Sequence, residues 1–161
     1  MKHLLTALLA VLALALFAAV VPAGEGAGTL GVLTEGKAAF EKKCSFCHSL
    51  ARTLSQNKGR DQWSMTVKRM VSYGAPLNSG QRQAVTSYLT AKSNFETNCN
   101  ACHSNLRVLS GDAFKQDWKV TVGRMAKHLE ELAAKDKEAR QLTAEEVDEI
   151  AAYLSLTIPK D

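Results

Sequence analysis

The sequence has 161 residues, a formal net charge of +4 at pH 7 and only 6% aromatic residues. This length suits one ordinary domain or two very small ones, and few aromatic side chains are present to fill their cores. The net charge is modest, and we expect no nucleic-acid partner.

The N-terminus combines a short basic region, an apolar run and a cleavage site of small residues, which is the pattern of a secretory signal peptide. Lys2 supplies the charge, the run Leu4–Val21 has 18 residues, and cleavage is predicted after Ala23. We therefore expect a mature chain that is periplasmic or otherwise exported. An uncleaved membrane anchor is the alternative, because a run of this length just suffices to span a bilayer.

The first predicted elements of the mature chain follow from composition. Residues 24–33 are rich in glycine and are interpreted as a flexible leader. A helix is expected to begin near Thr34, to point Phe40 inward and to run into a cysteine motif at Cys44–His48. Residues 50–60 mix Ser, Asn and Gly without a lasting period and are predicted to form a loop.

The motif C-x-x-C-H occurs twice, at Cys44–His48 and again at Cys99–His103. This spacing is typical of c-type haem attachment, because one helical turn presents both sulfurs to the two vinyl groups of a porphyrin. The adjacent histidine then supplies the proximal ligand of the iron. We predict two haem c groups, bound covalently at Cys44, Cys47, Cys99 and Cys102 and ligated by His48 and His103.

Three other uses of paired cysteines fit the sequence less well. Disulfide frameworks do not require a histidine after each second cysteine. Zinc sites with two C-x-x-C pairs usually place them about 15 to 20 residues apart, whereas the gap from Cys47 to Cys99 is far longer. A thioredoxin-like pair would need a βαβ setting, and no strand pattern surrounds either motif.

Two further helices are predicted between the motifs. The first starts at Asp61 and ends at Gly74–Pro76, and its inner face consists of Trp63, Val67 and Met70. The second starts at Leu77–Ser79, and its apolar stripe consists of Val85, Tyr88 and Leu89. Because neither Gly nor Pro occurs from Gln81 to Ser110, we expect this helix to run almost directly into the second motif.

The second half of the chain repeats the first at a shift of 55 positions. Residues 36–70 and 91–125 share 15 identities in 35 pairs without a gap, which indicates a duplication. At a shift of 65, Ser87-Tyr88-Leu89 correspond to Ala152-Tyr153-Leu154, so the second unit carries ten extra residues. These fall in the charged segment 126–141, which is predicted to extend a helix into solvent.

The repeat also predicts the second axial ligand of each iron. Met70 lies 22 residues after His48, and Met125 lies 22 residues after His103. A single methionine on an apolar helix face is usually a core filler, but matched spacing in both copies favours His/Met ligation.

Two neighbouring side chains compete for these positions. Met65 has Val120 as its counterpart in the repeat and is interpreted as a packing residue. His128 lies three residues after Met125 and is the alternative ligand of the second iron. Its counterpart in the first unit is Tyr73, so the repeat argues against ligation and favours an exposed histidine.

Trp63 pairs with Trp118 in the repeat, and Arg69 pairs with Arg124. A buried indole N–H needs an acceptor and a guanidinium pairs well with carboxylates, so all four are candidates for contacts with haem propionates. The alternative arginines are Arg52 and Arg107. Ordinary core packing for the tryptophans and solvent exposure for the arginines remain open.

The two units resemble class I c-type cytochromes, in which a helix leads into C-x-x-C-H, a methionine follows and a closing helix carries Tyr-Leu. The pattern W-x-x-T-V-x-R-M at 63–70 and 118–125 is similar to the haem-binding part of the quinohaemoprotein amine dehydrogenase alpha subunit and to some photosynthetic reaction-centre cytochromes. The resemblance implies an all-α protein with two tandem haem domains, at residues 34–90 and 91–161.

If protein side chains fill both axial positions, no substrate reaches the iron and outer-sphere transfer of one electron remains. We therefore predict a dihaem electron carrier without catalytic residues. The alternatives are a haem-binding subunit of a larger oxidoreductase, and a small dihaem peroxidase or gas sensor with an open iron. Residues 36–90 contain nine basic and two acidic residues, against ten and twelve in 91–161, so an acidic redox partner is expected at the first unit.

Overall fold

The computed structural model describes residues 25–100, 102, 104–110, 117–136 and 140–158, and these form helices and no strand. The helices are α2 (Glu25–Ala39), η1 (Phe40–Cys44), α3 (Ala51–Leu54), α4 (Arg60–Ser72), α5 (Ser79–Cys99), α6 (Asn105–Ser110), α7 (Trp118–Ala133) and α8 (Ala144–Thr157). The prediction of an all-α protein is confirmed for this part of the chain. The predicted signal peptide lies outside the described residues, among which no helix has the length and apolar character of a membrane span.

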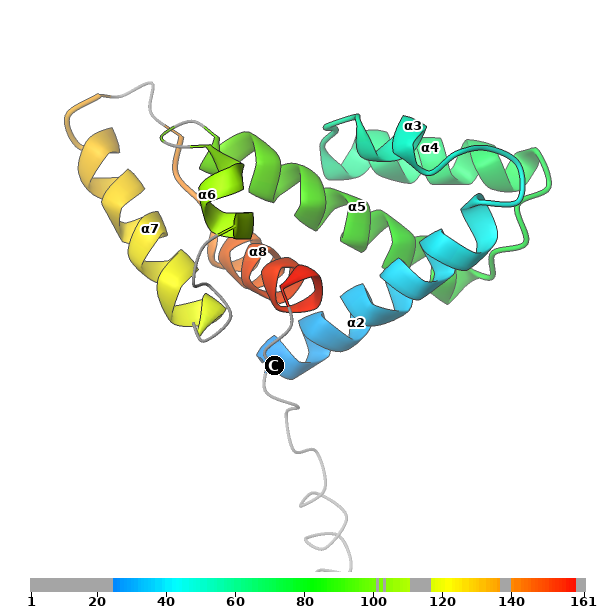
Figure 1. Cartoon of the computed structure of the whole chain (residues 1–161), viewed down its shortest axis with the longest axis horizontal. Helices are drawn as coiled ribbons and strands as arrows, with labels where there is room; N and C mark the ends of the chain where they lie inside the picture. The colour runs from blue at the N-terminus through cyan, green and yellow to red at the C-terminus, as the bar shows by residue number, and fades with distance from the viewer. Residues whose placement is uncertain (1–24, 101, 103, 111–116, 137–139, 159–161) are drawn as a thin grey trace, which may run out of the picture.

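Helix α5 is the centre of the arrangement (Figure 1). It packs against α2, α4 and α8, while α7 packs against α8. The helix begins at Ser79 because the Asn78 side chain accepts a hydrogen bond of 2.8 Å from the Gln81 N–H. It then runs unbroken to Cys99, as the absence of Gly and Pro predicted. The predicted boundary between residues 90 and 91 therefore falls inside one helix that both halves of the repeat share.

The prediction of a flexible leader is wrong for the described part of residues 24–33, because α2 begins at Glu25 and not near Thr34. Leu33 is fully buried. Further along α2, a Cβ on Gly36 would lie 2.1 Å from the Ala84 carbonyl oxygen, so only glycine allows α2 to approach α5 this closely. Burial against α5 and α8 overrides the low helix propensity of glycine.

A chain of buried aromatic rings joins the two halves of the repeat. The ring of Phe40 lies 5.9 Å from that of Tyr88, and Phe95 lies 5.8 Å from Tyr153, measured between centroids. Tyr88 and Tyr153 lie 5.8 Å apart and connect these pairs. The predicted inward position of Phe40 is confirmed. One core therefore runs through both halves.

Two boundaries in the first half differ from the predicted ones. The segment 50–60 is not wholly a loop, because it contains the short helix α3, and α4 begins at Arg60. Helix α4 ends near the predicted place, where Gly74 takes a left-handed conformation with φ of 99° that glycine adopts at little cost.

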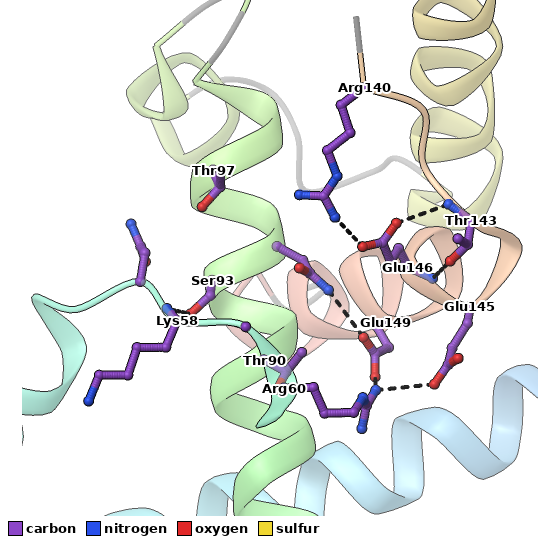
Figure 2. Close-up of a pocket in the computed structure, with 13 residues that line it drawn as sticks. Lys58, Arg60, Thr90, Ser93, Thr97, Arg140, Thr143, Glu145, Glu146 and Glu149 are labelled. Carbon is purple, nitrogen blue, oxygen red and sulfur yellow. Dashed lines mark hydrogen bonds and ion pairs between the residues drawn. The ribbon is translucent and has the colours of Figure 1, made fainter. Parts of the chain in front are cut away.

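Ion pairs fasten the start of α4 to α8, across the junction of the two halves (Figure 2). The Arg60 guanidinium donates to Glu145 at 3.1 Å and to the buried Glu149. Asn94 on α5 also donates to Glu149, at 3.3 Å. These groups line a polar cavity of about 450 Å³. The contacts bind the basic first unit to the acidic start of α8.

Candidate functional site

The first cysteine motif begins at Cys44, where the single turn η1 that continues α2 ends. Cys44 is half-buried and Cys47 is exposed, and both thiols are free. Burial, and to a lesser degree Cys47, raises the pKa of the Cys44 thiol. A nucleophilic redox cysteine of the thioredoxin type has a lowered pKa, so this environment argues against such a role.

A cavity of about 470 Å³ lies beside this motif. Cys44, His48 and Met70 all line it, although they come from η1, from the turn after it and from the far end of α4. The predicted inner face of α4 is confirmed, because Trp63 and Val67 are buried and line the same cavity as Met70. The fold thus brings a thiol, an imidazole and a thioether to one apolar-walled space.

His48 is oriented by the backbone. Its Nδ1 lies 3.1 Å from the Ser49 carbonyl oxygen. A carbonyl oxygen can only accept, so Nδ1 carries the hydrogen in this contact and Nε2 keeps a free lone pair. This tautomer is the one that a proximal iron ligand requires, and a backbone contact of this kind fixes the ring of a ligating histidine.

The other predicted residues of the first site differ in their surroundings. The Trp63 indole N–H donates to the Ser93 hydroxyl on α5 at 2.9 Å, so its hydrogen is already bonded within the chain. Arg52 and Arg69 line the cavity and are exposed. Neither forms an ion pair with an acidic side chain in the described part of the structure, which leaves both guanidinium groups free for carboxylates. Their contacts with haem propionates stay predictions.

The second motif begins at the end of α5. Cys99 is half-buried and Cys102 is exposed. Burial, followed by the effect of Cys102, raises the pKa of Cys99 to about 11. His103 lies outside the described residues, and so does the side chain of Arg107. The second proximal ligand therefore stays a prediction.

Helix α7 carries the remaining residues predicted for the second site. Trp118 is buried, and its N–H has no hydrogen-bond partner among the described residues. Met125 is 41% exposed, and Arg124 is exposed as well. A buried donor without an acceptor is costly, and a carboxylate of a bound group would satisfy it. The surroundings of Trp118 thus fit the propionate contact that the sequence predicts.

The two competing residues both lie at the surface. Met65 is 62% exposed, so its interpretation as a packing residue is wrong. It points away from the core because it lies five residues before Met70, on another side of α4. His128 is exposed, as predicted, and its Nδ1 lies 3.5 Å from Glu131. Ligation by His128 stays an open alternative.

Two residues of α5 that were not predicted, Lys92 and Ser93, contact residues that line the first cavity. Lys92 is buried and binds the segment that follows α3. A signal was present, because Lys92-x-x-Phe95-Glu96 repeats Lys37-x-x-Phe40-Glu41. Ser93 has no such signal, since Ile158 takes its place at the shift of 65.

Residues 86–154 match the family model described as cytochrome c oxidase, cbb3-type, subunit III. The matched range contains the second cysteine motif, Met125 and most of α8. It supports a c-type cytochrome with covalently bound haem c and a haem-based electron-transfer function. The first cysteine motif lies outside the match. Searches of curated proteins and of solved structures found no match.

Proposed function

We propose that this chain is an exported dihaem c-type cytochrome that carries single electrons between redox partner proteins. The observation that carries the proposal is the convergence of Cys44, His48 and Met70 on one cavity. Cys44 would supply covalent attachment, and His48 and Met70 would supply the two axial ligands. The three residues come from separate segments of the chain. The repeat extends the same arrangement to Cys99, Cys102, His103 and Met125, and the family match to this range supports it.

Haem c, when bound, supplies an iron that takes up and releases one electron. The chain's own residues decide what else reaches it. His48, held through Nδ1, lines the cavity with its other nitrogen free to bind, and Met70 supplies a thioether. If His48 and Met70 both ligate the iron, neither peroxide nor a gas would find a vacant position to bind. This arrangement favours a carrier over a peroxidase or a sensor.

The charge of the first unit supports an acidic redox partner there. Most of its basic side chains form no ion pair with any acidic residue that the structure describes; these are Lys42, Lys43, Arg52, Lys58, Lys68, Arg69 and Arg82. Arg52 and Arg69 lie at the cavity itself, together with the exposed Tyr73. An acidic partner would approach the haem at this rim, and its association rate should fall with increasing ionic strength.

Haem staining, intact mass and an optical redox titration of the purified protein test the proposal. We expect two haem groups on the chain, low-spin spectra in both oxidation states and no binding of CO at rest. An N-terminus at Gly24 would establish export with cleavage. A colourless protein, or one whose mass contains no porphyrin, would contradict the proposal altogether. High-spin features with CO binding would contradict only the carrier role.

A haem-binding subunit of a larger oxidoreductase is the second candidate. The observation in its favour is the match to a family described as an oxidase subunit. Affinity purification from the native membrane fraction and from the soluble fraction separates the two candidates. A stoichiometric complex with an oxidase would favour the subunit, and a free monomer that exchanges electrons by collision would favour the carrier.

A further inference from the structure

Lys92 is a lysine of α5 whose side chain is only 2% exposed. Burying an ammonium group is costly unless every N–H finds an acceptor. Here the Nζ donates to the carbonyl oxygens of Leu54 and Gln56, the latter at 3.2 Å, and to the Asn57 side-chain oxygen at 3.1 Å. It also pairs with Glu96 on the next turn of α5, at 2.8 Å. The ammonium group is therefore fully bonded.

The segment that Lys92 holds is a wall of the first cavity. Gln56 and Lys58 line that cavity. The segment lies between α3 and α4, and its backbone N–H groups form no helical hydrogen bond after that of Gln56. Ser93 binds the same segment, because its hydroxyl accepts from the Lys58 N–H at 3.2 Å (Figure 2). Two adjacent residues of α5 thus fasten residues 54–58 and Trp63.

The repeat supplies a natural comparison for this lysine. Lys37 occupies the equivalent position on α2, with Glu41 as the equivalent of Glu96. Its side chain is 36% exposed, and its Nζ lies 3.8 Å from Glu41. No hydrogen bond from Lys37 to a loop is present in the described structure. The Lys92–Glu96 pair on α5 therefore holds a wall of the cavity, whereas the equivalent Lys37–Glu41 pair lies at the surface.

We propose that Lys92 is a positioning residue for the first haem site. It belongs to the helix that ends at Cys99 of the second motif, yet it holds residues 54–57 closed against the first cavity. A closed wall keeps water from the first haem, and exclusion of water favours the reduced, less charged iron. This inference rests on the proposed function, because it assumes a haem on Cys44 and Cys47.

Hydrogen exchange and redox titration of the full-length haem protein test this role, with Lys92→Met compared against Lys37→Met. In Lys92→Met, the amides of Leu54, Gln56 and Lys58 should exchange at least about tenfold faster. The reduction equilibrium of the first haem should shift about tenfold toward the oxidised form, which is about 59 mV for one electron. The second haem should not change. Lys37→Met should leave both measurements as in the unmodified protein.

The first haem is identified as the titration component that is lost in the Cys44→Ala/Cys47→Ala variant. Equal exchange rates and equal potentials in Lys92→Met and Lys37→Met would overturn the inference. If Lys92→Met fails to fold, Asn57→Ala removes a single acceptor of the same ammonium and should change both measurements in the same direction by less. An unchanged Asn57→Ala would then overturn it. An unmodified protein without haem on Cys44 and Cys47 would instead contradict the proposed function.

Discussion

The two halves of the repeat carry the same motif residues but surround them differently. In the first half the Trp63 N–H is bonded to Ser93 and Met70 lines a cavity. In the second half the Trp118 N–H has no partner in the described residues and Met125 is 41% exposed. The residues that would face iron are therefore the same in both halves, while the residues behind them differ.

Position in the chain explains this difference. Helix α5 follows the first half, so its second part can support the first cavity with Lys92 and Ser93. The corresponding place after Tyr153 is taken by Ile158, which is buried but has no side-chain hydrogen-bonding group. The first site is thus supported by the second unit, and the described structure holds no equivalent support for the second site.

Removal of the attachment thiols should have the largest effect on this comparison. We expect Cys44→Ala/Cys47→Ala and Cys99→Ala/Cys102→Ala each to lose one haem of two, because a thioether forms only at a cysteine sulfur. Intact mass and haem staining measure the loss. A double variant that still carries two haem groups would show that its motif is not an attachment site.

Substitution of the methionines should separate the two sites by reduction potential. Methionine ligation raises the potential of haem c, so Met70→Ala and Met125→Ala should each lower the potential of one haem by at least about 59 mV, a tenfold change in equilibrium. Optical redox titration measures both components. His128→Gln is the control and should change neither. A higher second potential in His128→Gln, with no change in Met125→Ala, would assign the ligand to His128.

Gly36→Ala should reveal how closely α2 and α5 pack in the first half. The new Cβ would collide with the Ala84 carbonyl group, and overpacking of this kind costs about 1–3 kcal/mol of unfolding free energy. The repeat has Ala91 at the equivalent position, so this restriction applies to the first half alone. Gly28→Ala is the control, because its Cβ would meet nothing within 4 Å. Denaturant titration should show equal or higher stability for the control.

Ser93→Ala should make the first half resemble the second. The substitution removes the acceptor of both the Trp63 indole and the Lys58 amide. An unsatisfied buried donor costs about 1–3 kcal/mol, and denaturant titration measures it. Ser155→Ala is the matched control, since the Ser155 hydroxyl only donates back to its own helix at Ala151. Equal stability of the two variants would mean that Ser93 does not support Trp63.

The smallest expected effect is the pH dependence of the unfolding free energy that arises from Glu149, at the junction between the halves. Burial raises the pKa of Glu149 above its usual range, while Arg60 and Asn94 lower it and Glu145 raises it. The folded protein therefore holds this proton when the unfolded chain has lost it. The unfolding free energy should fall as the pH rises from the pKa of this carboxyl in the unfolded chain, about 4.3, through its higher pKa in the folded protein. Glu149→Gln should remove this part of the pH profile, and an identical profile would contradict the prediction.

The candidate site was largely predictable from the sequence because its signals are local. Cysteine and histidine spacing, the methionine 22 residues later and the cap at Asn78 depend only on nearby residues. The structure places Met70 at the same cavity as Cys44 and His48. Haem attachment, iron ligation, the second haem and the domain boundaries stay predictions.

What the sequence determined by itself was the helical class, the repeated C-x-x-C-H pattern and the unbroken helix between its two copies, since each follows from periodicity or spacing along the chain. Only the tertiary structure decided that residues 25–33 are helical, that Met65 faces solvent and that Lys92 is buried. Glycine-rich α2 and the ammonium of Lys92 are unfavourable locally. Contacts with segments more than thirty residues away make them stable.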